Sequence, residues 1–213
     1  MRSPTKIWVI SPSGNKDRSH DEKLKAVTEL FDRTGLAYKV PDDILREQWN
    51  KLMLNTGVNQ VTAVYGAPYS LIQKEGEART MMIEAMREVL RVADTQDIDL
   101  TEADIDYWLE LLATLNPEGH TSMCQDVLAG RPTEVDLFAG TMLKIAKKEG
   151  FSLPVNTFLY EKLKELEGYQ EYAYKRGVFT RPFLNYLYAM VPYVIQEDEL
   201  VQVLQCMKDW FAR

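Results

Sequence analysis

Three polar side chains share one face of a predicted helix that is otherwise apolar. Lys51, Asn55 and Asn59 are spaced four residues apart, which places them along roughly 12 Å of one helix face. Asparagine and glycine are both unfavourable in a helix interior. The intervening Gly57 lowers helix stability by roughly 1 kcal/mol relative to alanine. Lys51 taken alone is better explained as a solvated residue. The three together indicate a functional site, because strong helices break local rules where function requires it.

Ser122 and Glu134 lie at the expected starts of two further helices. Ser122 and Gln125 fit a capping box, in which the serine side chain accepts a hydrogen bond from the backbone three residues later. Glu134 follows Thr133, the expected cap of the next helix, where the helix dipole favours a carboxylate. The pattern alone favours a structural role for both. A helix N-terminus also suits the carboxylate of a substrate, so the two roles are compatible.

The chain offers little for metal, nucleophilic or dinucleotide chemistry. Cys124 and Cys206 have no spacing typical of disulfides or metal ligands, and the two histidines, His20 and His120, add none. Without a Ser-His-Asp order around it, His120 is interpreted as a loop residue, and Cys124 beside Met123 as a packed one. No two of the 11 glycines are separated by a single residue. The G-x-G turn that cradles dinucleotide phosphates is therefore absent.

Composition indicates a folded protein and excludes some partners. The 213 residues are 46% hydrophobic and 27% charged, which is ordinary for a globular protein. A formal net charge of −7, with Lys and Arg scattered among acids, argues against nucleic-acid binding. There is no apolar signal segment, and no stretch approaches the roughly 18 apolar residues of a membrane span. We therefore expect a cytoplasmic protein with no membrane or nucleic-acid partner.

Residues 1–41 predict a small strand–helix–strand unit. The strands are expected at 6–10 and 36–40, and the helix between them at 21–34, stopped by Gly35. Such a unit is too small to form a sheet domain. We interpret it as the βαβ remnant of a larger parallel Rossmann sheet.

Residues 42–167 predict a helical domain, so the fold class is mainly α. Helices are expected over about 42–64 after Asp42 or Asp43, over 77–94, from Thr101, from Thr133 to Gly150, and from Pro154 to Gly168. Apolar residues recur at helical spacing in each of them. In the second helix these inward residues are Met82, Met86, Val89 and Ala93.

Residues 168–213 form an aromatic-rich tail. Eight tyrosines and phenylalanines crowd its first part: Tyr169, Tyr172, Tyr174, Phe179, Phe183, Tyr186, Tyr188 and Tyr193. A last helix over about 197–211 aligns four apolar residues on one stripe: Leu200, Leu204, Met207 and Phe211. The pattern favours a tail that packs on the preceding helices, and the alternative is a partner or dimer surface.

These motifs resemble the C-terminal part of the ketopantoate reductase (2-dehydropantoate 2-reductase) family. The signature W-x-K-x-x-x-N-x-x-x-N is matched by Trp49, Lys51, Asn55 and Asn59. The block S-M-x-x-D-x-x-x-G-R-x-T-E-x-D is matched by Ser122, Met123, Asp126, Gly130, Arg131, Thr133, Glu134 and Asp136. A third rhythm is met by Gly140, Ala146, Gly150, Pro154, Asn156 and Leu159. The resemblance runs from about residue 42 to residue 167, and its joint spacing is specific.

The resemblance implies a multi-helix substrate and dimerisation domain of the 6-phosphogluconate dehydrogenase C-terminal type, joined in the family to a Rossmann domain that binds NADPH. The implied reaction is the reduction of 2-dehydropantoate or a related 2-keto acid in pantothenate biosynthesis. In the family, the lysine matching Lys51 donates a proton to the carbonyl oxygen, and the asparagines matching Asn55 and Asn59 orient the keto acid. The residues matching Ser122 and Glu134 bind the substrate carboxylate and hydroxyl. A partly desolvated lysine suits proton donation, because desolvation lowers its pKa.

The chain departs from the family pattern in the missing phosphate turn, in the unmatched tail, and at Tyr69 and Gly119, where some relatives have polar substrate contacts. We therefore expect a truncated reductase that by itself is inactive and binds no NADP(H). A non-catalytic dimerisation or small-acid-binding module is the alternative, and a helical scaffold is the least expected. An uncovered flank of residues 1–41 together with the aromatic tail predicts a homodimer. The five candidate residues are expected to converge on one cleft.

Overall fold

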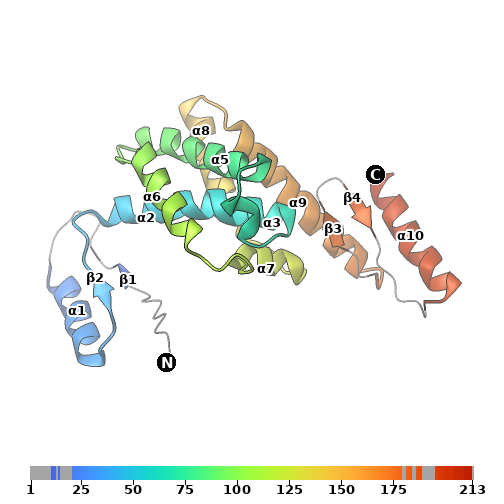
Figure 1. The fold of residues 1–213 in the computed structure, drawn as a ribbon, viewed down its shortest axis with the longest axis horizontal. Coiled ribbons are helices and arrows are strands. Elements are labelled where there is room, and N and C mark those ends of the chain that lie inside the picture. The colour runs from blue at the N-terminus through green and yellow to red at the C-terminus, as the bar shows by residue number, and fades with distance from the viewer. Residues whose placement is uncertain are drawn as a thin grey trace.

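The computed structural model describes residues 11–12, 14, 21–178, 181–183, 186–188 and 195–212, and helices dominate this part of the chain. Figure 1 shows a small N-terminal unit, a central helical body, and a last helix beside the end of α9. In chain order the elements are β1 (Ser11–Pro12), α1 (Glu22–Thr34), β2 (Tyr38–Lys39), α2 (Ile44–Leu54), η1 (Asn55–Asn59), α3 (Gln60–Tyr65), α4 (Ser70–Gln73), α5 (Glu77–Asp94), α6 (Glu102–Ala113), α7 (Ser122–Leu128), α8 (Ala139–Glu149), α9 (Pro154–Tyr174), β3 (Arg181–Phe183), β4 (Tyr186–Tyr188) and α10 (Glu197–Phe211).

The N-terminal unit contains α1 and a two-residue parallel ladder between β1 and β2. Asp21 begins α1 by accepting a hydrogen bond from the backbone N–H of Leu24 at 2.9 Å, and Gly35 ends it at a φ of 68°. The expected helix and its stop are therefore confirmed. The strand expected over 6–10 lies outside the described residues. A ladder of two residues does not establish a Rossmann sheet, so the interpretation of this unit as a remnant stays a prediction.

The core of the central body is built around α5. Its expected inward residues are all fully buried: Met82, Met86, Val89 and Ala93. α5 contacts η1, α9 and α2, and α9 adds Leu159, Leu163 and Leu166 to the same core. The mainly helical domain is thus confirmed, with the faces that helical periodicity predicted. Within the described part of the chain, no helix combines the length and apolar character needed to cross a membrane.

The long helix expected over about 42–64 contains a π-helical turn. α2, η1 and α3 follow one another directly, and the Asp43 side chain caps the first of them. Within the turn, Nε2 of Gln60 donates to the Thr56 carbonyl oxygen at 2.6 Å. Side chains that enter the backbone ladder deform helices in this way, and π-turns occur frequently at functional sites. Helical periodicity did not predict the turn, because the apolar pattern continues through it.

Gly57 lets α5 lie directly against η1. A Cβ at this position would come 2.7 Å from Cγ of Met86 and 3.0 Å from the backbone oxygen of Met82. We expect Gly57→Ala to lower the free energy of unfolding by about 1–3 kcal/mol, because overpacking forces the two helices apart. Urea denaturation measures the change. Gly140→Ala is the control: its Cβ would have no neighbour closer than 3.4 Å, so it should be neutral or stabilising. Equal losses for the two substitutions would contradict the packing explanation.

Two predicted caps are wrong. Thr121 caps α7 instead of Ser122, and its Oγ1 accepts a hydrogen bond from the N–H of Cys124 at 3.1 Å. Thr133 does not begin a helix, because α8 starts only at Ala139. The backbone N–H and the hydroxyl of Thr133 instead donate to Glu167 of α9 at 2.7 and 2.6 Å. A long-range partner therefore replaces the local capping bond.

The expected helix end at Gly168 is also wrong, since α9 continues to Tyr174. A Cβ at Gly168 would lie 3.3 Å from the Trp210 ring of α10, so this glycine permits a close approach between helices. Here α9 and α10 form a second core cluster, which consists of Tyr169, Tyr172, Ala173, Val178 and Cys206 with Val203 and Trp210 against it.

The apolar stripe expected on α10 is only partly covered, because Leu200 and Met207 are half-buried while the other two residues are exposed. Leu204 and Phe211 are 52% and 64% exposed, whereas Cys206 is buried. α10 therefore contacts α9 through the neighbouring face, where the tyrosines of α9 receive the Trp210 ring. The tail aromatics between residues 179 and 193 have no described side chains.

Candidate functional site

A small cavity of about 190 Å³ lies between the polar stripe and α6. Its lining residues are Lys51, Leu54, Asn55, Val58, Asn59, Tyr69, Trp108, Leu111, Leu112 and Leu115. The structure thus brings the three predicted stripe residues together at one cavity. Asn55 and Asn59 lie at the two ends of η1, and Nδ2 of Asn59 is 3.5 Å from Oδ1 of Asn55.

Among the described residues that line this cavity, Lys51 is the one with a charged side chain. Its ammonium lies 5.9 Å from the centroid of the Trp108 ring. Among the described residues no carboxylate forms a salt bridge with it. The side chain is exposed at the cavity mouth, yet its apolar neighbours remove part of its hydration. This partial loss of hydration lowers the pKa of the Lys51 ammonium. An unpaired cation beside two carboxamides is suited to binding a small acid through charge-assisted hydrogen bonds.

A polar network that the sequence did not reveal holds Trp108 in place. The indole Nε1–H donates to Oδ1 of Asn50 at 2.6 Å, and Nδ2 of Asn50 lies 3.5 Å from the Asp104 carboxylate. Asp104 is fixed in turn by two bonds from Arg46, at 2.7 and 2.9 Å. It also completes the predicted capping box with Thr101, which is confirmed. Asn50 and Trp108 are 58 positions apart, so no local spacing could have paired them.

Tyr69 forms a second aromatic wall, and Gly119 makes room for it. A Cβ at Gly119 would come 3.1 Å from the Tyr69 ring. The backbone N–H of Tyr69 donates to the Gly119 carbonyl at 2.9 Å. Tyr69 and Gly119, the two positions that depart from the family pattern, therefore act together. Because residue 119 is a glycine, the Tyr69 ring can lie against its backbone at the cavity.

Ser122 and Glu134 do not line this cavity, and both side chains are exposed. Ser122 follows Thr121, whose hydroxyl lies 2.8 Å from that of Thr62, and α7 contacts η1. Ser122 thus begins a helix that packs beside the polar stripe. Glu134 lies in the turn before α8, where its carbonyl accepts from the N–H of Leu137 at 2.9 Å. The convergence of all five residues on one cleft stays a prediction.

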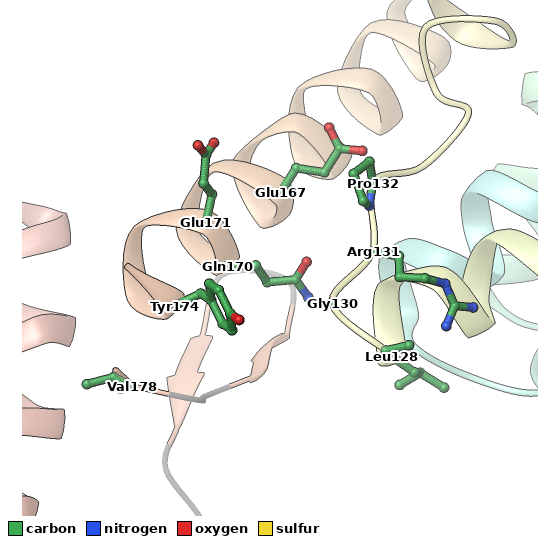
Figure 2. A pocket seen from close by; sticks show the side chains of 10 residues that line it. Leu128, Gly130, Arg131, Pro132, Glu167, Gln170, Glu171, Tyr174 and Val178 are labelled. Atoms are coloured by element: carbon green, nitrogen blue, oxygen red, sulfur yellow. The ribbon is translucent and has the colours of Figure 1, made fainter. Parts of the chain in front are cut away.

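Figure 2 shows a larger cavity, of about 400 Å³, between the loop after α7 and the end of α9. Several of its polar side chains already have partners within the protein. Glu167 accepts from Thr133, and Arg131 pairs with Asp126 at 2.7 Å. Gln170 donates to a backbone carbonyl at 3.0 Å. Despite its size, this cavity therefore offers a ligand fewer free polar groups than the smaller one.

Other reactive groups are poor candidates. Burial raises the pKa of the Cys124 thiol to about 11, so the reactive thiolate is scarce at neutral pH. The described residues contain no cluster of three or more His, Cys, Asp or Glu side chains that could hold a metal ion.

The described start of α1 carries acidic side chains. In a nucleotide-binding unit, the backbone N–H groups at the start of the helix receive the phosphates. In α1 the Asp21 carboxylate accepts one of these N–H groups, and Glu22 adds a second acid in the first turn. Two carboxylates at this helix end repel a pyrophosphate.

Comparison with known proteins places the helical body in a family. The family model described as "Ketopantoate reductase PanE/ApbA C terminal" matches residues 43–167. The chain is similar to the 2-dehydropantoate 2-reductase of Pyrobaculum aerophilum, with 29% identity over 144 residues. That match covers 68% of this chain and 51% of the relative. The chain spans about half the length of the curated relatives it matches.

Solved structures share the fold. A dimeric ketopantoate reductase from Staphylococcus aureus has a TM-score of 0.65 at 20% identity, covering 71% of this chain and 53% of that chain. The ternary structure of D-mandelate dehydrogenase with NADH and anilino(oxo)acetate has a TM-score of 0.65 at 24% identity, covering 71% of this chain and 64% of that chain. At these identities the likeness shows the fold alone.

Proposed function

Because this chain belongs to the ketopantoate reductase family through its C-terminal domain, we propose that the Lys51 cavity binds a 2-keto acid. The observation that carries the proposal is a cation without a salt bridge among the described residues, at a cavity that two carboxamides also line. The Lys51 ammonium faces the keto oxygen, and the Asn55 and Asn59 amides orient the acid. Ser122, at the start of the helix beside the stripe, is the candidate for the carboxylate end.

The chemistry proposed for Lys51 follows from its surroundings. When the carbonyl is reduced, negative charge develops on its oxygen, and a nearby ammonium stabilises that charge and then supplies the proton. Burial lowers the pKa of Lys51, which makes the proton easier to give up. The role implied for Glu134, contact with a substrate hydroxyl, has no support in the cavity, because Glu134 does not line it.

The reductase activity itself is proposed for a protein that joins this domain to a nucleotide-binding domain. NADP(H) would supply the hydride there. For this chain by itself the proposal is limited to acid binding. We propose that residues 1–41 correspond to the end of such a nucleotide-binding sheet.

Titration calorimetry on the full chain tests the acid site. 3-Methyl-2-oxobutanoate should bind, and 3-methylbutanoate, which lacks only the keto oxygen, should bind about tenfold more weakly, because Lys51 loses its partner. Equal affinities of the two acids would mean that the keto oxygen makes no favourable contact with Lys51. Absence of binding by both acids would favour a non-catalytic helical module that does not bind keto acids.

The affinity for the keto acid should depend on pH. Only the protonated ammonium of Lys51 attracts the acid, so affinity is full below its pKa and falls as the pH rises through it. Because burial lowers this pKa, the fall should begin below the ordinary range of lysine. Calorimetric titrations across the alkaline range measure it. A Lys51→Met variant should show no such fall, and a wild-type affinity that stays constant to pH 11 would contradict the assignment.

We also propose that the chain forms a homodimer in the cytoplasm. The relative from Staphylococcus aureus is described as dimeric, and Leu204 and Phe211 expose apolar surface on α10. Both cysteines, Cys124 and Cys206, are buried and form no disulfide, as suits a reducing compartment. Light scattering should give a species of about twice 24.6 kDa. A single 24.6 kDa species across the micromolar range would contradict the dimer.

A further inference from the structure

We propose that the Lys51 cavity selects 2-keto acids with an apolar side chain, and that Trp108 and the leucines of α6 determine this preference. The inference rests on the proposed function and names the substrate class of the same site. The α6 side of the cavity contains none of the residues of the family motifs.

The two sides of the cavity differ in chemistry. Lys51, Asn55 and Asn59 all come from the continuous α2–η1 helix. The side contributed by α6 consists of Trp108, Leu111, Leu112 and Leu115, the last just beyond the helix end. The leucines present only carbon. The α6 side of the cavity is thus apolar. The α2–η1 side carries the three polar residues beside Leu54 and Val58, and Tyr69 adds a hydroxyl.

The single polar atom of the α6 side is already used. The indole Nε1–H of Trp108 donates to Asn50 at 2.6 Å, and Asn50 lies outside the cavity lining. The bond from Arg46 to Asp104 and the capping box of α6 hold this network in place. Trp108 therefore faces the cavity with its ring surface, and it cannot turn its N–H towards a ligand without breaking the bond to Asn50.

A 2-keto acid fits this division. Its keto and carboxylate oxygens can be matched by the ammonium and the two carboxamides, and its side chain then points towards α6. A hydroxyl on that side chain would exchange water for carbon surface and lose its hydrogen bonds. An apolar site rejects an added hydroxyl only moderately, by up to about a hundredfold. A measurable but limited preference for the apolar acid is therefore expected.

The exposed position of Glu134 supports the same conclusion. A carboxylate is the natural partner of a substrate hydroxyl, and among the described residues none lines this cavity. The chain retains the glutamate in sequence, and in the turn before α8 its side chain is exposed.

A matched pair of ligands tests the inference on the full chain. 3,3-Dimethyl-2-oxobutanoate and its 4-hydroxy derivative, 2-dehydropantoate, differ by one oxygen atom. Titration calorimetry should give a Kd about tenfold lower for the acid without the hydroxyl, which corresponds to about 1.4 kcal/mol. Equal affinities, or tighter binding of 2-dehydropantoate, would overturn the inference.

Three variants assign the preference to the α6 wall. Leu111 lines the cavity and is 40% exposed, so Leu111→Asn can add a carboxamide to the wall without burying it, and the preference should shrink to about twofold or less. Glu110→Asn is the matched control, because Glu110 is exposed and lies outside the lining, and it should leave the tenfold ratio unchanged. Trp108→Phe keeps the carbon wall and should keep the preference. If Leu111→Asn fails to fold, the affinities of the two acids for the wild type and for Trp108→Phe still test the inference.

The Lys51→Met variant separates a failure of the proposed function from a failure of the side-chain preference. If both acids bind and both require Lys51, but the hydroxylated acid is not disfavoured, the inference is wrong and the proposed function stands. If neither acid binds, or if binding is unaffected by Lys51→Met, the proposed function fails, and the inference fails with it.

Discussion

Lys51→Met is expected to weaken the binding of 3-methyl-2-oxobutanoate by about a hundredfold, which is about 2.7 kcal/mol. A hydrogen bond to a charged group contributes about 1.5–3 kcal/mol, and no other charged side chain of the described part of the chain lines the cavity. Methionine has a similar length and suits the apolar neighbours, so the change removes the charge and little else. Titration calorimetry on the full chain measures the loss.

The variant should remain folded, which allows the loss to be assigned to binding. Since Lys51 forms no salt bridge among the described residues, Lys51→Met should change the free energy of unfolding by less than about 0.5 kcal/mol. Lys148→Met is the control for charge alone, because the Lys148 side chain is 83% exposed, and it should leave affinity unchanged. Equal affinities of wild type and Lys51→Met would remove Lys51 from the site.

Glu88→Ala is expected to cause the largest loss of stability, about 3–5 kcal/mol. Glu88 is a buried carboxylate of α5, 6% exposed. It accepts hydrogen bonds from the backbone N–H groups of Val155 and Asn156 and from the Asn156 side chain, each at 2.8 Å. Pro154 begins α9 without an N–H, so the carboxylate satisfies the next two donors of that helix end. Its removal leaves the backbone N–H groups of Val155 and Asn156 without their acceptor, and the Asn156 side chain keeps only its bond to the Ala85 carbonyl oxygen.

Urea denaturation measures this change, and Glu84→Ala is the matched control. Glu84 lies one turn earlier on α5, and its salt bridge to Arg87 is exposed, so its removal should cost less than about 1 kcal/mol. Glu88→Gln, which keeps the shape but offers one acceptor, should fall between the two. A loss below about 1 kcal/mol for Glu88→Ala would mean that water or a neighbouring side chain replaces the carboxylate.

The Glu88 network also reaches the candidate site. The Asn156 side chain accepts from Nε2 of Gln60 at 3.3 Å, and Gln60 also bonds the Thr56 carbonyl within the π-turn. Asn156 is fully buried, which gives the P-x-N motif of the sequence a structural meaning. The motif joins α9 to α5 and to the helix that carries the polar stripe.

The sequence by itself determined the features that depend on neighbours along the chain. Helical spacing is set by backbone geometry within a few residues, so it predicted the buried face of α5 and the shared face of Lys51, Asn55 and Asn59. The caps at Asp43 and Thr101 followed for the same reason, since their side chains bond to the backbone three residues later. The helical class and its family resemblance rest on these local patterns.

Only the tertiary structure decided the features that depend on distant partners. Thr133 bonds Glu167 instead of capping a helix, Gly168 receives a ring of α10 instead of ending α9, and Gly57 meets the backbone of α5. The apolar wall opposite Lys51 likewise depends on a bond between Asn50 and Trp108. Helical periodicity states which residues share a face. It contains no information about which other helix will cover that face, because this choice is made by packing between segments that are far apart in the chain.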